Sequence, residues 1–279
     1  MTEEFNSSLS DSDFNKLASF IYLNYGIKLP ITKKIMLESR LKPRLRINNM
    51  NSYKEYSQFI LSGKCGEAEI INMIDLVSTN KTDFYRESDH FDFMKSVILP
   101  EHYSNHSERI FKVWSSASSS GEEAYTTAIV ISEFLEGKRP FDYSILGTDI
   151  STRIIEKAAL AIYPIDRVDV IPLAQKKKYL LRSKDQINQT VRIVSELRSK
   201  TRFQRLNLMD NSFDVPKDFD LIFCRNVLIY FDRETQEKVI SKLCYHLRKG
   251  GYFFLGHSES ISGYDVPLKQ LKPTIFQKI

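Results

Sequence analysis

The sequence has few cysteines, no long apolar run and no glycine-rich loop, and each absence excludes a class of protein. Its 279 residues include only three cysteines, Cys65, Cys224 and Cys244, which fit neither a disulfide framework nor a zinc site. No apolar stretch approaches the roughly 20 residues that a membrane helix needs, and the opening MTEEFNSSLSDSD is too polar for a signal peptide. We therefore expect a cytoplasmic protein with reduced thiols, no metal and no membrane insertion.

The composition is that of an ordinary globular protein. Hydrophobic residues make up 42% of the chain and charged residues 27%, which is typical of soluble domains. The net charge of +5 is too small by itself to indicate a nucleic-acid partner. The length suggests one large domain or two of ordinary size.

Before residue 78 the apolar residues repeat at helical spacing. In DSDFNKLASFIYLNY they recur every three or four positions, and Asp11 or Asp13 is expected to cap the helix. A second helix is expected over TKKIMLESRL, kinked or ended by Pro43, which removes a backbone donor. Two more helices follow without any strand pattern, so residues 1–77 are predicted to form a helical domain.

After residue 88 predicted strands alternate with predicted helices, which is typical of an α/β fold with a parallel sheet and right-handed crossovers. The strands are expected at RIFKVWS, DYSILGTD, DLIFC and YFFLGHS, with helices between them. The segment 163–206 breaks this rhythm and is rich in lysine and arginine. We expect it to be an insertion that forms a small β-hairpin on the main sheet.

Polar residues stand where the predicted strands end. Arg225 and Asn226 interrupt the apolar run DLIFCRNVLIYFD, and a buried polar pair costs free energy unless something satisfies it. Ligands of parallel α/β sheets bind beyond the carboxyl ends of the strands, so we expect a ligand crevice at this edge. The residues at the predicted strand ends are Ser115–Gly121, Asp149, Arg225-Asn226 and His257-Ser258.

These residues fit a cationic adenosine ligand better than a phosphorylated one. Of a G-x-G-x-x-G loop only Gly121 is present, and Glu122 and Glu123 at the start of the next helix would repel phosphate. Asp149 has the position of a ribose-binding carboxylate. The pattern therefore favours S-adenosylmethionine, an adenosine compound with a sulfonium charge.

Each of these residues also has a purely structural interpretation. Asp149 could cap the helix that begins near Thr152, and Glu122 and Glu123 could only complement a helix N-terminus. His257, in FLGHSES, is interpreted as a structural histidine rather than a general base.

Six segments together resemble the chemotaxis receptor methyltransferases, which transfer methyl groups from S-adenosylmethionine to receptor glutamates. They are SRLKPRLR, STNKTDFYRE, VWSSASSSGEEAYT, GTDIS, FCRNVLIYFD and LRKGGYFFLGHSES. The resemblance implies a helical N-terminal domain (1–77), a linker that contributes to the site (78–88) and a Rossmann-like methyltransferase domain (89–279). It also implies a β-subdomain inserted at about 163–206.

The resemblance implies roles for individual residues as well. Asp149 would accept hydrogen bonds from the ribose, Glu123 would balance the ammonium group of the cofactor, and Arg225 would act through its backbone. Arg86 would pair with a carboxylate of the cofactor or the substrate, and Tyr230 would lie near the reacting methyl group. The implied cofactor contacts are Asn80, Thr82, Arg86, Glu123, Asp149, Asn207, Leu208, Arg225 and Asn226.

The implied reaction gives glutamyl methyl esters and S-adenosylhomocysteine and serves sensory adaptation in bacteria. A glutamate carboxylate, with a pKa of about 4.3, is ionised at neutral pH and needs no general base. Two other functions stay open at this point. The chain could methylate RNA or a small molecule, since the fold hosts many acceptors, or it could bind the cofactor as a non-catalytic regulator.

The expected partner is the cytoplasmic helical domain of transmembrane chemotaxis receptors, with recruitment to receptor arrays at the inner membrane. Lys33, Arg40 and Arg44 fall near one helical face and would dock the receptor's acidic helices. Binding of a receptor tail peptide is doubtful, because the loop RSKDQINQT has no glycine, and no nucleic-acid partner is expected. The neighbouring stripe, expected to pack inward, consists of Leu37, Leu41 and Leu45.

Overall fold

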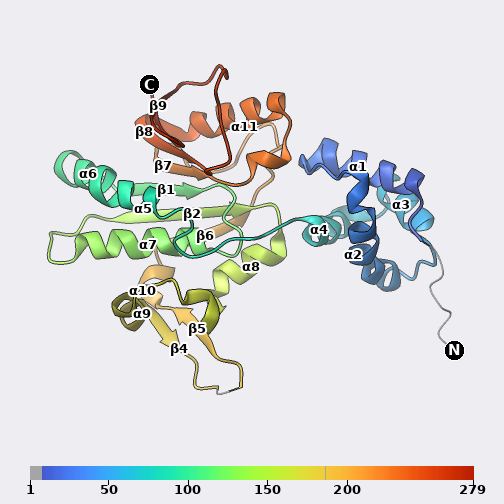
Figure 1. Cartoon of the computed structure of the whole chain (residues 1–279), viewed down its shortest axis with the longest axis horizontal. Helices are drawn as coiled ribbons and strands as arrows, with labels where there is room; N and C mark the ends of the chain where they lie inside the picture. The colour runs from blue at the N-terminus through green and yellow to red at the C-terminus, as the bar shows by residue number, and fades with distance from the viewer. Residues whose placement is uncertain (1–7, 186) are drawn as a thin grey trace. The chain divides into compact units, whose positions relative to one another are not determined.

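The computed structural model describes residues 8–185 and 187–279 and divides into two compact units (Figure 1). The first unit contains the described residues up to Thr79 together with Asn207–Met209, and the second contains Asn80–Leu206 and Asp210–Ile279. The first seven residues of MTEEFNSSLSDSD, and Gln186 of the loop RSKDQINQT, lie outside the described residues. No helix in the described part of the chain is long and apolar enough to span a membrane.

The described residues of the first unit form helices joined by loops and contain no strand, as predicted. Its elements are α1 (Asp11–Tyr25), η1 (Ile31–Lys33), α2 (Lys34–Ile47), α3 (Tyr53–Leu61) and α4 (Gly66–Val77). The predicted cap of α1 at Asp11 or Asp13 is wrong. Ser10 is the cap, because its hydroxyl oxygen accepts the Asp13 N–H and donates in turn to the Asp13 carboxylate.

Helix α2 runs through Pro43 and ends at Ile47. A proline removes a single backbone donor. That loss is tolerated here because α2 packs inward along its length through a stripe of its own leucines. Those leucines are fully buried, which confirms the predicted inward stripe of Leu37, Leu41 and Leu45.

Two of the three basic residues predicted to dock a receptor are used inside the first unit. Arg44 makes a bidentate pair with Glu69, which also accepts the Tyr56 hydroxyl at 2.8 Å. The Arg40 guanidinium donates to the last carbonyls of α4, the nearest being Leu76 at 2.9 Å. These contacts hold α2 on α4, so Arg40 and Arg44 are structural here, a role that helical spacing alone could not reveal.

The second unit is built on a seven-stranded sheet in the order β6-β2-β1-β7-β8-β10-β9. The pairings from β6 to β8 are parallel, whereas β10 pairs antiparallel with β8 and with β9. The expected parallel sheet is therefore mixed, with a C-terminal hairpin that was not predicted. The strands are β1 (Phe111–Ser115), β2 (Tyr143–Asp149), β6 (Thr201–Arg205), β7 (Phe219–Cys224), β8 (Leu247–Leu255), β9 (Leu268–Lys272) and β10 (Ile275–Lys278).

Helices cover both faces of this sheet (Figure 1). Val113 belongs to the core that includes Ala128 and Ile129 of α7, while the next residue of β1, Trp114, contacts His246 of α11 on the other face. The helical elements are α5 (Asp89–Phe93), the π-helical η2 (Met94–Ile98), α6 (Leu99–Asn105), α7 (Glu122–Leu135), α8 (Thr152–Leu160), η4 (Leu228–Tyr230) and α11 (Arg233–His246).

The segment predicted as an inserted hairpin differs from the prediction in two ways. It holds a separate three-stranded antiparallel sheet in the order β3-β5-β4, and its last strand, β6, pairs with β2 in the main sheet. The alternating apolar and polar residues of VRIVSELRSKTRFQRLNL (191–208) predict one or two strands, and two strands, β5 and β6, lie there. Such alternation does not say which sheet a strand joins. The elements of the insertion are β3 (Ile162–Pro164), η3 (Ile165–Val168), α9 (Leu173–Tyr179), β4 (Leu180–Arg182), β5 (Thr190–Ile193) and α10 (Ser195–Arg198).

Candidate functional site

The loop after β1 lies across the carboxyl ends of the two neighbouring strands. The Ser116 N–H donates to the carbonyl of Phe223 on β7 at 2.9 Å, and the Ser118 N–H donates to the carbonyl of Thr148 on β2 at 2.7 Å. Gly121 ends the loop with φ of +94°, a left-handed conformation that suits glycine. A side chain at Gly121 would come within 3.2 Å of Ala158, Tyr163 and Phe203, so α7 can start here only with glycine.

Asp149 ties this loop to the start of α8. Its carboxylate accepts the N–H of Ser119 at 3.0 Å and the N–H of Ser151 at 3.1 Å. The cap of α8 is Ser151, whose hydroxyl accepts the Ile154 N–H. The structural alternative for Asp149, as the cap of this helix, is therefore wrong. The carboxylate lies at the end of β2 with 9% of its residue surface exposed.

Glu122 is buried and does more than complement a helix N-terminus. Its carboxylate accepts the Ser120 hydroxyl at 2.6 Å and lies 3.3 Å from the guanidinium of Arg167. Burial raises the pKa of Glu122, and Arg167 opposes that rise. Arg167 also binds the Thr82 carbonyl and the Asp83 carboxylate, so it fastens the segment before α5 to the inserted subdomain.

The side chain of Arg225, directly after β7, is the centre of a buried ion cluster. Its Nε lies 3.2 Å from Glu123 of α7 and 3.5 Å from Glu87, and its Nη2 donates to the carbonyl of Arg86 at 2.6 Å. Glu123 also accepts the Ser115 hydroxyl at 2.5 Å. Burial raises the pKa of Glu123, while the positive charge of Arg225 lowers it. Acids from two other segments thus balance the charge of this arginine, although its Nε and Nη1 have no hydrogen-bond partner among the described residues.

Asn226 turns the chain away from the strand and contacts the same cluster. Its φ is +57°, a conformation that asparagine tolerates better than most residues, and its amide donates to Glu87 at 3.2 Å. A side chain at Gly256 would come within 2.5 Å of this amide. The ends of β7 and β8 are therefore packed so closely that only glycine fits at 256.

Glu259, which was not among the residues predicted for the site, joins these two strand ends. Its buried carboxylate accepts the backbone N–H groups of Asn226, Leu228 and Gly256 at 2.7–2.8 Å. The sequence does show an acid within four residues of a strand end, in LGHSES. That pattern does not predict which backbone N–H groups the acid binds.

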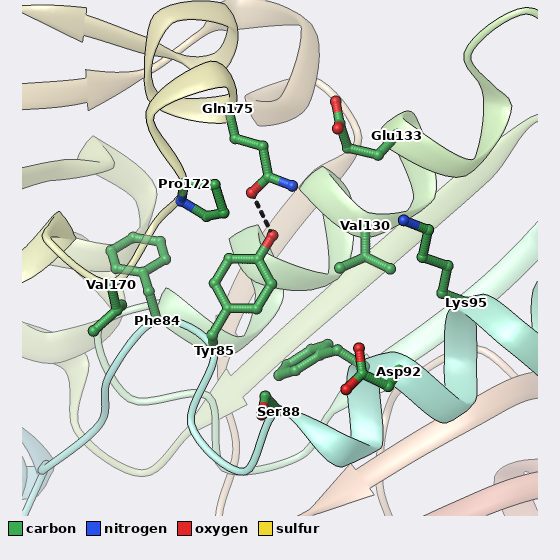
Figure 2. A pocket seen from close by; sticks show the side chains of 11 residues that line it. Phe84, Tyr85, Ser88, Asp92, Lys95, Val130, Glu133, Val170, Pro172 and Gln175 are labelled. Carbon is green, nitrogen blue, oxygen red and sulfur yellow. Dashed lines mark hydrogen bonds between the residues drawn. The ribbon is translucent and has the colours of Figure 1, made fainter.

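The segment Asn80–Ser88 is held by the elements around it. The Tyr85 N–H donates to Thr126 of α7 at 3.2 Å, and its hydroxyl donates to Gln175 of α9 at 2.7 Å. Figure 2 shows this second bond beside a cavity of about 450 Å³ lined by residues of α5, α7 and the insertion. None of the residues predicted to bind the cofactor lines that cavity.

The structure brings most of the predicted site residues together in the second unit. Arg86, Glu123, Arg225 and Asn226 meet at the ion cluster around Glu87. Asn80 accepts the hydroxyl of Ser119, whose N–H binds Asp149, and Thr82 is buried next to Arg167. Tyr230 is half-buried at the end of η4.

Asn207 and Leu208 are not placed with these residues. Both belong to the first unit, where the Asn207 amide donates to the carbonyl of Asn24 at 2.9 Å. Their predicted contacts with the cofactor remain predictions.

Two family models match almost the whole described chain. Residues 12–78 match "CheR methyltransferase, all-alpha domain" and residues 80–276 match "CheR methyltransferase, SAM binding domain". The chain belongs to the CheR methyltransferase family. The resemblance, the Rossmann-like fold with a helical N-terminal domain, and the dependence on S-adenosylmethionine are thereby confirmed.

Curated relatives carry the same assignment over nearly their whole length. The chain is 39% identical to the "Chemotaxis protein methyltransferase" of Borreliella burgdorferi, with 98% of this chain and 96% of the relative covered. It is 36% identical to the protein of that name from Salmonella typhimurium, over 91% of this chain and 86% of the relative. The Escherichia coli K12 relative is 35% identical, over 94% of this chain and 88% of the relative.

Substitution of Glu259 tests its role at the strand ends. Glu259→Ala leaves three backbone donors without their acceptor, so we expect the free energy of unfolding to fall by about 3 kcal/mol. Glu259→Gln keeps one acceptor oxygen and should lose less. Urea unfolding followed by circular dichroism measures both, with the exposed Ser258→Ala as control. A loss of less than about 1 kcal/mol in Glu259→Ala would contradict this role.

Proposed function

We propose that this CheR methyltransferase transfers the methyl group of S-adenosylmethionine to glutamate carboxylates of methyl-accepting chemotaxis receptors. The observation that carries the proposal is the match of both domains to relatives named chemotaxis protein methyltransferases. The products would be a glutamyl methyl ester and S-adenosylhomocysteine. The receptors lie in the inner membrane, and the enzyme would act on their cytoplasmic helical part, recruited to receptor arrays.

The strand edge offers groups that suit this cofactor. The Ser118 hydroxyl is buried and has no hydrogen-bond partner among the described residues, and it lies in the loop that Asp149 holds at the end of β2. A buried polar atom of this kind calls for a partner. S-adenosylmethionine supplies a methyl group on a positively charged sulfur. The residues proposed to hold it are Asn80, Thr82, Arg86, Glu123, Asp149, Asn207, Leu208, Arg225 and Asn226.

The proposed chemistry requires positioning rather than proton transfer. An acceptor glutamate is ionised at neutral pH, so the enzyme must align its carboxylate and exclude water, and good alignment can lower a barrier by roughly 7–11 kcal/mol. Arg86 is proposed to align the carboxylate, because its side chain is one-third exposed and donates only to the Lys81 carbonyl at 3.0 Å among the described hydrogen bonds. Tyr230 is proposed to present its ring to the sulfonium.

Methyl transfer to defined receptors tests this proposal directly. The chain and its Arg86→Ala variant are incubated with labelled S-adenosylmethionine and membranes that carry receptors with glutamate or glutamine at the acceptor positions. We expect base-labile labelling of the glutamate receptor by the wild type only, because a neutral amide is a far weaker nucleophile than a carboxylate. The exposed Lys81→Ala serves as control.

Three outcomes would overturn the proposal. Equal labelling of glutamine receptors would exclude a carboxylate acceptor. Labelling of RNA or a small molecule instead would favour the first alternative function, and cofactor binding without transfer to any acceptor would favour a non-catalytic regulator.

Asp149 is proposed to bind the ribose through a charge-assisted hydrogen bond. We expect Asp149→Ala to weaken S-adenosylmethionine and S-adenosylhomocysteine alike, by about 10- to 100-fold, because the two compounds share the ribose. Calorimetry on both ligands is the measurement. Asp142→Ala is the matched control, since Asp142 precedes the opposite end of β2 and is exposed. Unchanged affinity in Asp149→Ala would reduce the residue to a support of the Ser119 loop.

The docking surface proposed from the sequence is revised by the contacts of α2. Arg40 and Arg44 hold α4, so their reversal would damage the fold. Lys42 and Arg46 lie one turn apart on the exposed side of α2. We propose that they, with the half-buried Lys33, meet the acidic receptor helices. We do not propose binding of a receptor tail peptide, because the loop RSKDQINQT has no glycine.

Reversal of the exposed pair tests the revised surface. Lys42→Glu with Arg46→Glu should slow receptor methylation several-fold at low salt and little at high salt, since charge steering is screened over about 8–10 Å at physiological ionic strength. Affinity for the cofactor should not change. The control is Lys54→Glu with Lys64→Glu, an equal charge change at exposed positions of the same unit. Equal effects of the two double variants would show that net charge, rather than α2, guides the encounter.

A further inference from the structure

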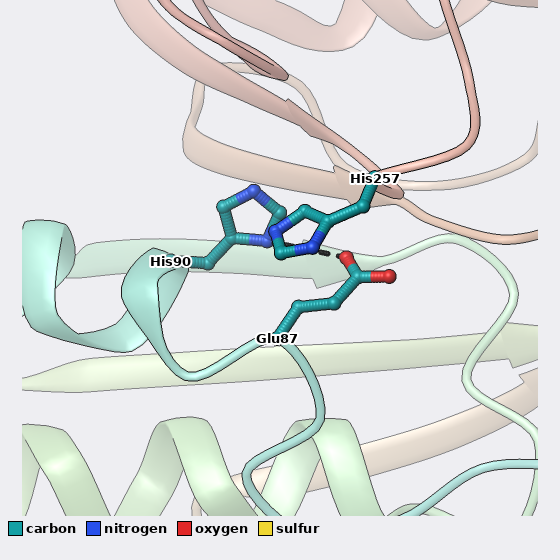
Figure 3. Close-up of side chains that lie close together, drawn as sticks. All are labelled: Glu87, His90 and His257. Carbon is teal, nitrogen blue, oxygen red and sulfur yellow. Dashed lines mark ion pairs between the residues drawn. The ribbon is translucent and has the colours of Figure 1, made fainter.

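Glu87, His90 and His257 bring one potential ligand atom each to within 4.8 Å of one another (Figure 3). Glu87 precedes α5, His90 lies on it, and His257 follows β8. None of the three is among the residues proposed to hold the cofactor or the acceptor, although Glu87 contacts Asn226 and Arg225, which are. His90 is fully buried, Glu87 is 11% exposed and His257 is 51% exposed, so the group extends from the interior to the surface.

The hydrogen bonds of His90 determine which of its nitrogens carries the proton. Its Nε2 lies 2.9 Å from the hydroxyl oxygen of Thr274. That hydroxyl donates to the carbonyl of Pro273 at 2.8 Å, so the oxygen can only accept from His90. Nε2 is therefore the protonated nitrogen of the neutral ring, and Nδ1 presents a lone pair.

This lone pair points at another acceptor. Nδ1 of His90 lies 3.7 Å from Oε2 of Glu87, and neither atom has a hydrogen-bond partner among the described residues. Two buried acceptors facing each other are unfavourable unless a positive species lies between them. A proton on His90 would need Nδ1 and Oε2 within about 3.2 Å of each other to form a hydrogen bond, and their separation of 3.7 Å is longer than that.

The separation suits a metal ion instead. Ligand bonds of about 2.0–2.2 Å from nitrogen and oxygen to one tetrahedral ion place two ligand atoms between 3 and 4 Å apart, as a rough estimate. We propose that Glu87, His90 and His257 bind a divalent transition-metal ion such as Zn²⁺, with water as the fourth ligand. The expectation from the sequence that the chain has no metal site would then need correction.

Both histidines already have the outer hydrogen bonds that metal-binding histidines use. His90 donates from its far nitrogen to Thr274, and Nε2 of His257 lies 3.1 Å from the carboxylate of Asp89, which leaves Nδ1 of His257 for the ion. Such partners fix the ring and raise its basicity as a ligand. Thr274 has φ of +60°, an uncommon conformation for a β-branched residue. In this conformation its hydroxyl contacts Nε2 of His90 and orients the ring.

Arg225 opposes a cation here, because its Nε lies 3.5 Å from Oε2 of Glu87. Its charge is shared, however, with Glu123 at the shorter distance of 3.2 Å. The carboxylates of Asp89 and Glu123 balance the guanidinium groups of Arg86 and Arg225, so the ligand Glu87 gives the site a net charge of −1 toward the ion.

Metal binding by the full chain tests the proposal without any readout of methyl transfer. After chelator treatment, calorimetry with Zn²⁺ alone should show saturable binding of one equivalent. Glu87→Gln and His257→Ala should weaken it by more than about 10-fold, and Thr274→Val by about 10- to 100-fold. His106→Ala, at an exposed histidine outside the cluster, should leave it unchanged. Co²⁺ should give the spectrum of a tetrahedral site without a thiolate charge-transfer band.

His90 is fully buried, so the site is tested through His257→Ala and Thr274→Val, which do not replace a buried ligand. Absence of saturable Zn²⁺ binding by the wild type would overturn the proposal. So would equal affinity in His257→Ala and His106→Ala, or a thiolate band, which would assign the ion to the cysteines.

Discussion

The edge of the sheet at which the site lies depends on one buried guanidinium, that of Arg225. A charge removed from water costs several kcal/mol unless partners compensate. The partners of Arg225 are Glu123 at the start of α7, Glu87 before α5 and the carbonyl of Arg86. Because the strand fixes the arginine, the arginine in turn fixes Glu123 in the first turn of α7 and Glu87 just before α5. Loss of this interaction would release the segment that carries Arg86.

A buried carboxylate, that of Glu259, holds backbone segments together at this edge, as the Arg225 guanidinium holds side chains together. It gathers N–H groups from the residues after β7 and after β8, where the strands have ended and the groups have no partners in the sheet. The close approach of Gly256 to Asn226 depends on this arrangement. The catalytic unit thus builds its loops from side chain to backbone contacts rather than from flexible glycine-rich turns.

The sequence was sufficient to predict the elements that are determined by neighbouring residues. The helix Tyr53–Leu61, the inward leucines of α2 and the strand ends at Asp149 and Arg225 follow from periodicity and from polar interruptions of apolar runs. It was insufficient to predict contacts between residues that are far apart in the chain. Arg225 meets Arg86 across 139 positions, and Arg44 meets Glu69 across 25. Spacing on one helix cannot distinguish a basic residue that is exposed from one that is paired.

The edges of the sheet were predicted incompletely for a related reason: β9 was not predicted, and β6 was predicted as a strand but not as part of the main sheet. Both are edge strands in which only one neighbour is available, so their outer positions are polar and their apolar signal is weak. A short polar strand and a loop look alike in sequence. The order of the sheet became clear only from pairing, which is a property of two segments and not of one.

The charges at the site also decide which guanidinium can meet an acceptor. Arg225 has 3% of its side chain exposed and is bound by two carboxylates, so an arriving glutamate would have to displace one of them at a cost of several kcal/mol. Arg86 has 33% exposed, and its Nη1 bond to the Lys81 carbonyl occupies one of its five donors. An acceptor carboxylate can therefore pair with Arg86 without disturbing the buried cluster. In our proposal the two arginines divide the work, one holding the site together and the other aligning the carboxylate that is methylated.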